Sequence, residues 1–386
     1  MFFHEVARML RANGHEVAMM SCAEPGLDAA GVEFFPEAVD YRNGGIIKRV
    51  LNFPGMIYNR GAKAAMARRI SEFCPDIVHA FAIYVRLTPA ILEAAKEAGV
   101  PVVLSCNDYK HICPNYKLFH HGKICDDCKG GHFYQALRNR CCHDSVAFSA
   151  ASMVEAYVQD GLDIWRRNVH TFLFASKFMA EKTEEFWGKG RVRIDFLRNP
   201  FDVARHEITP NVGDYVLYFG RLIEEKGVDV LLEAAALAPD VPIVIVGDGP
   251  DQARLNARAL GLANVRMVGP AWGDDLAQYL HGARAVVVPS LWHENFPYVI
   301  LQAFAASKPV IGSSRGGIPE MIGDARGWTY QASDATALAT VLRQVVQLPN
   351  QKIAEIGADA LTFLREELSD DSTYERLIAI YRKALA

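Results

Sequence analysis

The feature that most constrains the fold is a regular alternation of short apolar runs and longer amphipathic stretches between Gly213 and Gly327. The runs are rich in β-branched residues, and several end in glycine or proline, where a parallel strand turns towards a helix. We interpret them as strands at residues 216–220, 243–247, 265–269, 285–289 and 309–313. The stretches between them predict helices at residues 228–238, 250–259, 274–282 and 297–306. This pattern predicts βαβ units around a parallel sheet.

The first half of the chain repeats the same theme less regularly. Its apolar runs predict strands at residues 14–21, 76–81, 101–106 and 168–176, with helices at 60–72 and 87–98. Pro, Asn and Gly accumulate between residues 197 and 214, where apolar periodicity lapses, and this predicts a hinge. A chain of 386 residues suits two domains of ordinary size. We therefore expect two doubly wound α/β domains, at 1–200 and 213–370, and a final helix at 371–386.

The composition narrows the class of protein. Hydrophobic residues make up 51% of the chain and charged residues 22%, with a net charge of -4, which is typical of a globular protein and not of one that coats nucleic acid. No stretch reaches the roughly 20 apolar residues that span a bilayer, and the N-terminus lacks the layout of a signal peptide. We predict a cytoplasmic location and no nucleic-acid partner.

Tandem doubly wound domains predict a ligand in the cleft between them, beyond the carboxyl ends of the strands. One predicted strand ends at the glycine signature Gly247-Asp248-Gly249-Pro250. A dinucleotide fingerprint needs its third glycine where this chain has Gln252. A nicotinamide oxidoreductase is therefore the least favoured interpretation.

A stronger site lies between residues 290 and 322, where a predicted strand leads into a polar loop and a helix that begins at Pro297. Proline suits the first helical turn, and the backbone amides around it would then be free to bind an anion. Glu294 precedes this turn and Gln302 follows it, and both side chains can hydrogen-bond to sugar hydroxyls. The alternative is an ordinary strand–helix junction with a solvated carboxylate.

Two basic residues, Arg221 and Lys226, follow the strand predicted at 216–220. When a sugar leaves a nucleoside diphosphate, negative charge grows on the diphosphate. Arginine can bind two phosphate oxygens at once, and lysine adds a compact charge. Taken alone, such a pair of basic residues is usually just solvated. It indicates a diphosphate site only because the predicted site around Glu294 accompanies it.

Together these residues resemble the C-terminal half of the retaining glycosyltransferases of family 4, in the GT-B superfamily. The resemblance is carried by four motifs: Gly220-Arg221 with Lys226-Gly227, Gly247-Asp248-Gly249-Pro250, Glu294-Asn295-Phe296-Pro297, and Gly316-Gly317-Ile318-Pro319-Glu320. It implies two Rossmann-like domains that face each other across a cleft, with the final helix returning to the N-terminal domain. It also implies a retaining, metal-independent transfer from a nucleotide-diphosphate sugar, with no cofactor needed for catalysis.

The family resemblance assigns roles to particular positions. Arg221 and Lys226 are expected to contact the donor diphosphate, and Glu294, the first acid of an E-x7-E motif, to lie close to the donor sugar; these three are the expected catalytic residues. The other donor-binding residues that it implies are Gly220, Gly247, Gly249, Asn295, Phe296, Pro297 and Gln302. Gln302 stands at the position of the motif's second acid, which contacts the ribose of the nucleotide. The glutamine weakens the expected binding of the ribose at two points.

The N-terminal half is expected to bind the acceptor, a glycan or lipid-linked molecule in cell-surface polysaccharide or glycolipid synthesis. Family members begin with a strand and a glycine-rich loop, whereas this sequence begins inside the following helix, so the domain is expected to lack its first strand. Asn107 replaces a histidine found in related enzymes, and we assign Asn107 and Asp108 to substrate contact, with a strand-end turn as the alternative. These departures keep open a catalytically impaired nucleotide-sugar-binding protein, and a sugar-nucleotide epimerase is a further alternative.

Six of the eight cysteines crowd into residues 106–142, a segment that resembles a cysteine-bearing insertion in a subset of the family. Below, residues 106–142 are called the cysteine-rich segment. In a reducing cytosol such a cluster favours metal or free thiols over disulfides. One Cys-x2-Cys pair flanked by single cysteines gives a candidate tetrahedral zinc set of Cys113, Cys125, Cys128 and Cys141. Structural zinc, free thiols and a disulfide all remain open.

Residues 42–69 carry seven basic side chains and no acid, interleaved with apolar residues. This pattern fits a peripheral contact with the anionic inner face of a membrane, or a basic helical face in solvent. His79, in the strand predicted at 76–81, is expected to be satisfied in the core.

Overall fold

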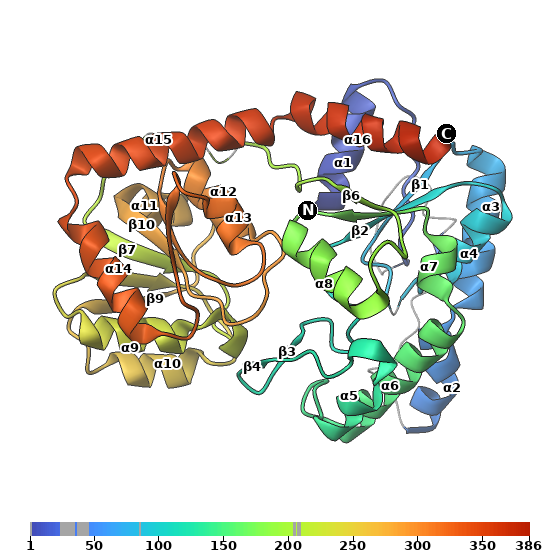
Figure 1. Ribbon diagram of the computed structural model, residues 1–386, viewed down its shortest axis with the longest axis horizontal. Helices are drawn as coiled ribbons and strands as arrows, with labels where there is room; N and C mark the ends of the chain where they lie inside the picture. The colour runs from blue at the N-terminus through green and yellow to red at the C-terminus, as the bar shows by residue number, and fades with distance from the viewer. Residues whose placement is uncertain (1, 24–34, 37–45, 85, 204–205, 207–209) are drawn as a thin grey trace.

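The computed structural model describes residues 2–23, 35–36, 46–84, 86–203, 206 and 210–386. The chain forms two α/β lobes side by side, and the last two helices run along one edge of both (Figure 1). This is the two-domain, parallel-sheet architecture predicted from the alternation of strands and helices.

The N-terminal lobe is built on a parallel sheet of strand order β1-β2-β5-β6, with a separate two-stranded hairpin. The strands are β1 (Val78–Phe81), β2 (Val102–Cys106), β3 (Phe119–His120), β4 (Lys123–Ile124), β5 (Thr171–Phe174) and β6 (Ile194–Phe196). The helices are α1 (Phe2–Ala12), α2 (Ile46–Ile57), α3 (Arg60–Phe73), α4 (Ala90–Glu97), α5 (Tyr134–Arg138), α6 (Val146–Gly161), α7 (Ile164–Asn168) and α8 (Lys177–Trp187), with a 3-10 turn at Lys129–Gly131.

The prediction of a strand at residues 14–21 was wrong. Residues 15–22 have no regular secondary structure, and β1 forms the edge of the described sheet without pairing to them. The backbone amides of a strand need a neighbouring strand as partner, so an apolar run forms a strand only where one lies alongside. Here the Val17 carbonyl accepts instead from the Arg11 side chain at 2.9 Å.

The C-terminal lobe holds a parallel sheet of order β12-β11-β10-β7-β8-β9. Its strands are β7 (Tyr215–Phe219), β8 (Ile243–Val246), β9 (Val265–Gly269), β10 (Ala283–Val288), β11 (Val310–Ser313) and β12 (Gly327–Tyr330). Its helices are α9 (Val228–Leu237), α10 (Gln252–Ala259), α11 (Gly273–Gly282), α12 (Tyr298–Ala305), α13 (Ile318–Ile322), α14 (Ala335–Gln347) and α15 (Asn350–Glu367), with a 3-10 turn at Glu224–Lys226. The order reverses between β7 and β10, the switch point at which doubly wound sheets bind ligands.

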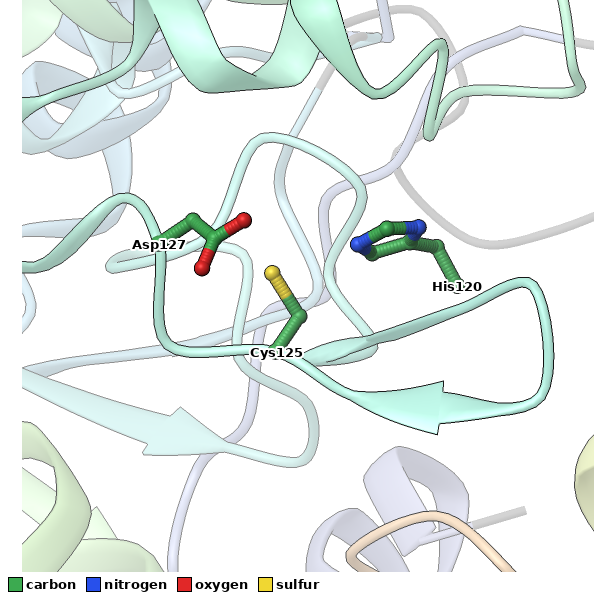
Figure 2. Close-up of side chains that lie close together, drawn as sticks. All are labelled: His120, Cys125 and Asp127. Carbon is green, nitrogen blue, oxygen red and sulfur yellow. The ribbon is translucent and has the colours of Figure 1, made fainter.

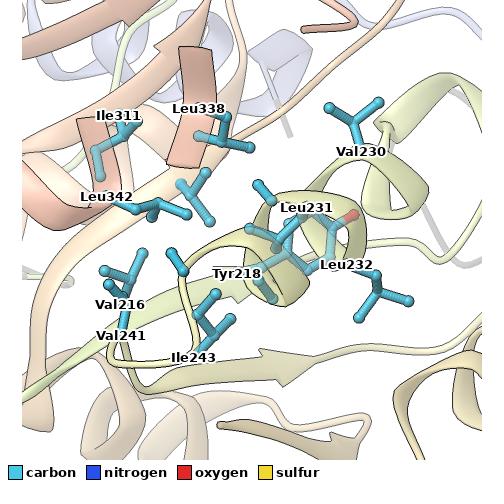
Figure 3. Packing of buried hydrophobic residues seen from close by; sticks show 14 of the residues in the cluster. Val216, Tyr218, Val230, Leu231, Leu232, Val241, Ile243, Ile311, Leu338 and Leu342 are labelled. Atoms are coloured by element: carbon cyan, nitrogen blue, oxygen red, sulfur yellow. The ribbon is translucent and has the colours of Figure 1, made fainter. Parts of the chain in front are cut away.

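The core of this lobe lies between the sheet and the helices that cover it. Val216 and Ile243 from β7 and β8 pack against Leu231 of α9 and Leu342 of α14, all with less than 2% of their surface exposed (Figure 3). Tyr218 of β7 and Val287 of β10 belong to the same buried cluster, close to the ends of the strands that carry the loops described below.

The final helix, α16 (Asp370–Leu385), packs on the N-terminal lobe as predicted. Leu377 and Ile380 are buried against Val6 and Met9 of α1, and Lys383 forms an ion pair with Asp195 at 2.9 Å. None of the helices in the described part of the chain combines the length and apolar character that crossing a bilayer requires.

His79 is satisfied in the core, as predicted. Its Nδ1 lies 2.7 Å from the Tyr381 hydroxyl and its Nε2 lies 2.8 Å from the Ser105 hydroxyl, and burial lowers the pKa of His79 to about 3. Because the unfolded histidine has a pKa of about 6.5, the unfolded state binds more protons between these values. This contribution to stability is complete above about pH 6.5 and is lost as the pH falls towards 3.

We therefore expect the free energy of unfolding to fall by about 2 kcal/mol more in the wild type than in His79→Gln between pH 7 and pH 4.5. Glutamine can keep a hydrogen bond but cannot be protonated in this range. Urea titrations of both proteins at the two pH values measure the difference. Equal losses in both proteins would show that His79 does not titrate in this way.

Candidate functional site

The loops that follow β7 and β10 meet at the switch point of the C-terminal sheet. The Leu291 amide donates to the Glu225 carbonyl at 2.9 Å, which joins the two loops backbone to backbone. At Gly227, φ is +71°, and a Cβ there would lie 2.0 Å from the Pro289 carbonyl oxygen. Only glycine allows this approach, which brings Lys226 beside the loop that carries Glu294.

The structure brings Lys226 and Glu294 into direct contact. The Lys226 ammonium donates to Glu294 Oε1 at 2.6 Å, and the Ser290 hydroxyl donates to the same oxygen at 2.8 Å. The Glu294 side chain is only 7% exposed, while Lys226 keeps 27% of its side-chain surface in contact with solvent and lies 5.4 Å above the Trp292 ring. Glu294 Oε2 makes no hydrogen bond within the described residues, so one oxygen of a fixed carboxylate is available to a ligand.

The Gly316-Gly317 turn fixes the backbone of Glu294. The Gly317 amide donates to the Glu294 carbonyl at 2.7 Å. Gly316 has φ of +57°, and a Cβ on it would lie 2.0 Å from the same carbonyl oxygen. The glycines therefore allow one loop to lie directly on the other and to hold Glu294 at the sheet edge.

The helix after Glu294, α12, begins at Tyr298, with Pro297 as its N-cap, one residue later than predicted. The amides of Asn295, Phe296 and Tyr298 donate no hydrogen bond within the described chain, which leaves them able to bind an anion. The Phe296 side chain packs in the core, so only its backbone faces this position. Gln302 is half-buried one turn along the helix, with no side-chain hydrogen bond among the described residues.

Arg221 lies in the loop after β7 with its side chain exposed. Its guanidinium makes no ion pair or hydrogen bond within the described residues, while its carbonyl accepts from the Tyr218 hydroxyl at 2.8 Å. Gly220 lies beside Gly247, since a Cβ on Gly247 would come within 1.9 Å of the Gly220 carbonyl. A Cβ on Gly249 would likewise come within 2.4 Å of the carbonyl of Leu222, so the loops after β7 and β8 adjoin.

Side chains of the C-terminal lobe contact the N-terminal lobe directly around the site. Asn295 accepts from the Ser176 hydroxyl at 2.9 Å and donates to the Cys106 carbonyl at 3.2 Å. Glu320 accepts from the amides of Lys177 and Phe178, at 2.9 and 2.8 Å, and so caps the start of α8. Sequence reasoning missed these contacts, although Glu320 belongs to a quoted motif and Ser176 ends a predicted strand.

The two residues predicted on the acceptor side follow β2. The Asp108 carboxylate accepts from the Lys110 amide at 3.0 Å and from the Tyr84 hydroxyl, and burial raises its pKa. Asn107 is half-buried, with no side-chain hydrogen bond in the described part of the protein. Asp108 therefore has the hydrogen bond of a strand-end turn, the alternative to substrate contact. The Asn107 side chain remains available to a substrate.

The cysteine-rich segment contains a compact group of metal-ligating atoms. Among the described residues, His120, Cys125 and Asp127 are the one set of three or more possible ligands whose atoms lie within 4.8 Å of one another (Figure 2). Of the four cysteines predicted as a zinc set, this group includes Cys125 alone, and no three of those four sulfurs lie within 4.8 Å of one another. The clustered cysteines form no disulfide in the structure.

Comparison with known proteins covers both lobes. Residues 1–205 match the family model described as Glycosyltransferase Family 4, and residues 205–359 match the model for glycosyl transferases group 1. A D-inositol 3-phosphate glycosyltransferase of Mycobacterium avium is 34% identical over 185 residues, 45% of this chain and 42% of that protein. The lipopolysaccharide core biosynthesis glycosyltransferase LpsE of Rhizobium meliloti is 32% identical over 226 residues, 55% of this chain and 65% of that protein. These alignments thus span roughly half of each relative.

Solved structures share the fold at lower identity. A sucrose-phosphate synthase from Thermosynechococcus elongatus superposes with a TM-score of 0.68 at 15% identity, covering 99% of this chain and 92% of that one. Anabaena Alr3699/HepE in complex with UDP gives a TM-score of 0.62 at 19% identity, covering 83% and 82%. These structures establish the two-domain fold.

Proposed function

The chain belongs to glycosyltransferase family 4, and on that premise we propose that it moves a sugar from a nucleotide-diphosphate donor to a glycan or lipid-linked acceptor, with retention of anomeric configuration. The observation that carries the proposal is the Lys226–Glu294 pair at the switch point, 2.6 Å apart. The glycosyltransferase names of the relatives and the UDP complex of a structural neighbour support a nucleotide-sugar donor. The name of the lipopolysaccharide core enzyme supports a cell-surface product.

In the proposed mechanism the donor diphosphate lies at the start of α12, against the free amides from Asn295 to Tyr298. Arg221 and Lys226 stabilise the charge that grows on the diphosphate as the sugar leaves, so we propose that the transfer needs no metal ion. The free oxygen of Glu294 accepts from a sugar hydroxyl, and Gln302 contacts the ribose. Asn107 borders the acceptor.

The test is an assay of purified protein with UDP-, GDP- and ADP-sugars and glycan or lipid-linked acceptors, with and without EDTA. NMR of the product reports its anomeric configuration. Transfer with retention that EDTA leaves intact is expected, whereas inversion or loss with EDTA would contradict the mechanism. Donor binding by calorimetry without any transfer would favour the catalytically impaired binding protein, and a changed sugar on donor incubated alone would favour the epimerase.

We also propose that the cysteine-rich segment binds a structural zinc ion. Cys113 and Cys128 are buried, and burial together with neighbouring thiols raises their pKa values. No three of the four predicted cysteine sulfurs lie within 4.8 Å of one another, so this set would have to draw together around the ion. The close group of His120, Cys125 and Asp127 offers a second ligand set that shares Cys125 with the first. Either set supplies ligands of the kind that zinc prefers.

Metal analysis of purified protein is expected to find one zinc per chain, lost in Cys125→Ser because both sets need that thiol. Cys113→Ser removes zinc only if the four cysteines bind it, and His120→Ala only if the mixed group does. Cys74→Ser, at an exposed cysteine far along the sequence from the segment, is the matched control and keeps the zinc. A wild type without zinc, or zinc retained in Cys125→Ser, would contradict the proposal.

Contact of residues 42–69 with the inner face of a membrane remains a proposal. Arg42 lies outside the described residues, and Arg60 and Arg68 are exposed on α3. Lys63 forms ion pairs with Glu93 and Glu97, at 3.1 and 2.7 Å, so the basic face carries less net charge than its sequence indicates.

A further inference from the structure

Buried polar atoms without partners gather where the cysteine-rich segment meets the C-terminal lobe. Within the described chain, five such atoms are Tyr109 Oη, Asp126 Oδ1, Trp292 Nε1, His293 Nδ1 and Arg315 Nε. Tyr109 is only 1% exposed and His293 only 7%. Buried polar groups are nearly always hydrogen-bonded, so several unpaired ones close to a candidate site need an explanation.

Direct contacts connect these atoms across the two lobes. The other oxygen of Asp126, Oδ2, accepts from the Lys182 ammonium on α8 at 2.8 Å. One turn earlier on α8, the Phe178 ring lies 4.5 Å from the ring of His293, which directly precedes Glu294. Burial raises the pKa of Tyr109, and the nearby carboxylates of Glu294, Glu320 and Asp126 raise it further. Unpaired groups of both lobes, Tyr109 from one and His293 from the other, thus lie near Glu294.

The cysteine-rich segment also contacts the loop that holds Lys226. Lys117 donates to Glu225 at 2.6 Å, and a Cβ on Gly122, at the tip of the β3–β4 hairpin, would lie 3.2 Å from a Glu224 carboxylate oxygen. In Figure 1 the hairpin extends from the N-terminal lobe towards the C-terminal lobe. The segment therefore borders the donor side of the cleft as well as the acceptor side.

The chemistry of the unpaired atoms selects one kind of ligand. Tyr109 can donate or accept, Trp292 only donates, and the Asp126 carboxylate only accepts. Asp126 and Glu294 are already paired with Lys182 and Lys226, and Arg315 is the one cation among the five unpaired groups. A phosphate could use Arg315 but would leave the Asp126 oxygen without a donor, and an apolar ligand would leave every atom unpaired. Sugar hydroxyls both donate and accept, so a sugar ring matches this mixed set. Burial lowers the pKa of His293 to about 4, which keeps its ring neutral and able to do both.

We propose that Tyr109 and His293 bind hydroxyl groups of the transferring sugar, with the cysteine-rich segment forming one wall of the sugar site. This inference rests on the proposed function and deepens it, because it names the residues that recognise the sugar, as distinct from the nucleotide. Tyr109 packs in the core of the N-terminal lobe, close to Glu294, and the His293 ring lies against Phe178 of that lobe. Both groups are covered in this structure, so the proposal requires the lobes to separate for the sugar to enter.

The test compares Tyr109→Phe with Tyr330→Phe. Tyr330 also has a buried, unpaired hydroxyl, but it lies in the C-terminal core on β12 and serves as the matched control. Calorimetry with UDP, UDP-glucose, GDP and GDP-mannose measures nucleotide and sugar contributions separately. We expect Tyr109→Phe to lower the affinity for the nucleotide sugar that the wild type binds by about five- to tenfold. Its affinity for the corresponding nucleoside diphosphate should stay unchanged, and Tyr330→Phe should change neither affinity.

A second variant, His293→Phe, keeps the ring contact with Phe178 and is expected to show the same selective loss. Thermal melting of both tyrosine variants should stay at or above the wild-type midpoint, because each loses an unpaired hydroxyl. Equal affinity of Tyr109→Phe and wild type for the nucleotide sugar, or equal weakening of sugar and nucleotide, would overturn the inference. A wild type that binds none of the four compounds would instead overturn the proposed function.

Discussion

Replacing Arg221 by alanine is expected to lower turnover about 100- to 1,000-fold while leaving the free energy of unfolding unchanged. The guanidinium is exposed and makes no hydrogen bond or ion pair within the described residues, so its removal costs the fold little. It lies in the loop after β7, at the switch point of the sheet where we propose that the diphosphate binds. The measurement is the steady-state rate at saturating donor, together with a urea titration.

Lys226→Ala is expected to reduce turnover to a similar extent, but with a second effect. It leaves the Glu294 carboxylate buried without its ion-pair partner, and we expect a loss of about 1–2 kcal/mol in stability. Arg343→Ala, at an exposed arginine on α14, is the control and should change neither quantity appreciably. Wild-type turnover in Arg221→Ala would remove that residue from the mechanism.

The sequence predicted most of the C-terminal lobe because its signals are local. Each buried strand is a short β-branched run, and the ends of neighbouring parallel strands meet at one sheet edge, which places Lys226 beside Glu294 although 68 residues separate them. The strand β12 was not predicted, since its sequence Gly-Trp-Thr-Tyr lacks the β-branched run that marked the others. The run at residues 14–21 is apolar but has only Val17 as a β-branched residue, and it pairs with no strand among the described residues.

Contacts between the lobes were beyond sequence reasoning for a different reason. No periodicity or spacing indicates that Glu320 caps α8 or that Asn295 bonds to Ser176, because these pairs depend on how two separately folded lobes are placed. The sequence likewise gives no sign that Tyr109 and His293 lie near each other, because each residue on its own is compatible with an ordinary core position. The cysteine spacing likewise predicted a ligand set, while three-dimensional proximity adds His120 and Asp127, which the spacing of sulfurs cannot reveal.

Gly316→Ala is expected to destabilise the protein by about 3 kcal/mol or more and to lower the turnover of the folded fraction at least about 100-fold. The added Cβ would lie 2.0 Å from the Glu294 carbonyl oxygen and 2.6 Å from the Glu294 amide nitrogen, so the loop that carries the carboxylate must shift. A shift of this size removes Glu294 from the position in which Lys226 and Ser290 hold it.

The matched control separates this clash from the cost of a positive φ alone. Gly273 has φ of +54°, almost the same as Gly316, but a Cβ there would meet no atom within 4 Å. Gly273→Ala should therefore cost only about 1–2 kcal/mol and leave turnover unchanged. If the two variants lose equal stability and keep equal turnover, the glycine turn does not hold Glu294. If only Gly316→Ala loses turnover, the position of the Glu294 carboxylate depends on backbone contact between the Gly316-Gly317 turn and the loop after β10. Sugar transfer at the switch point then depends on that contact as well.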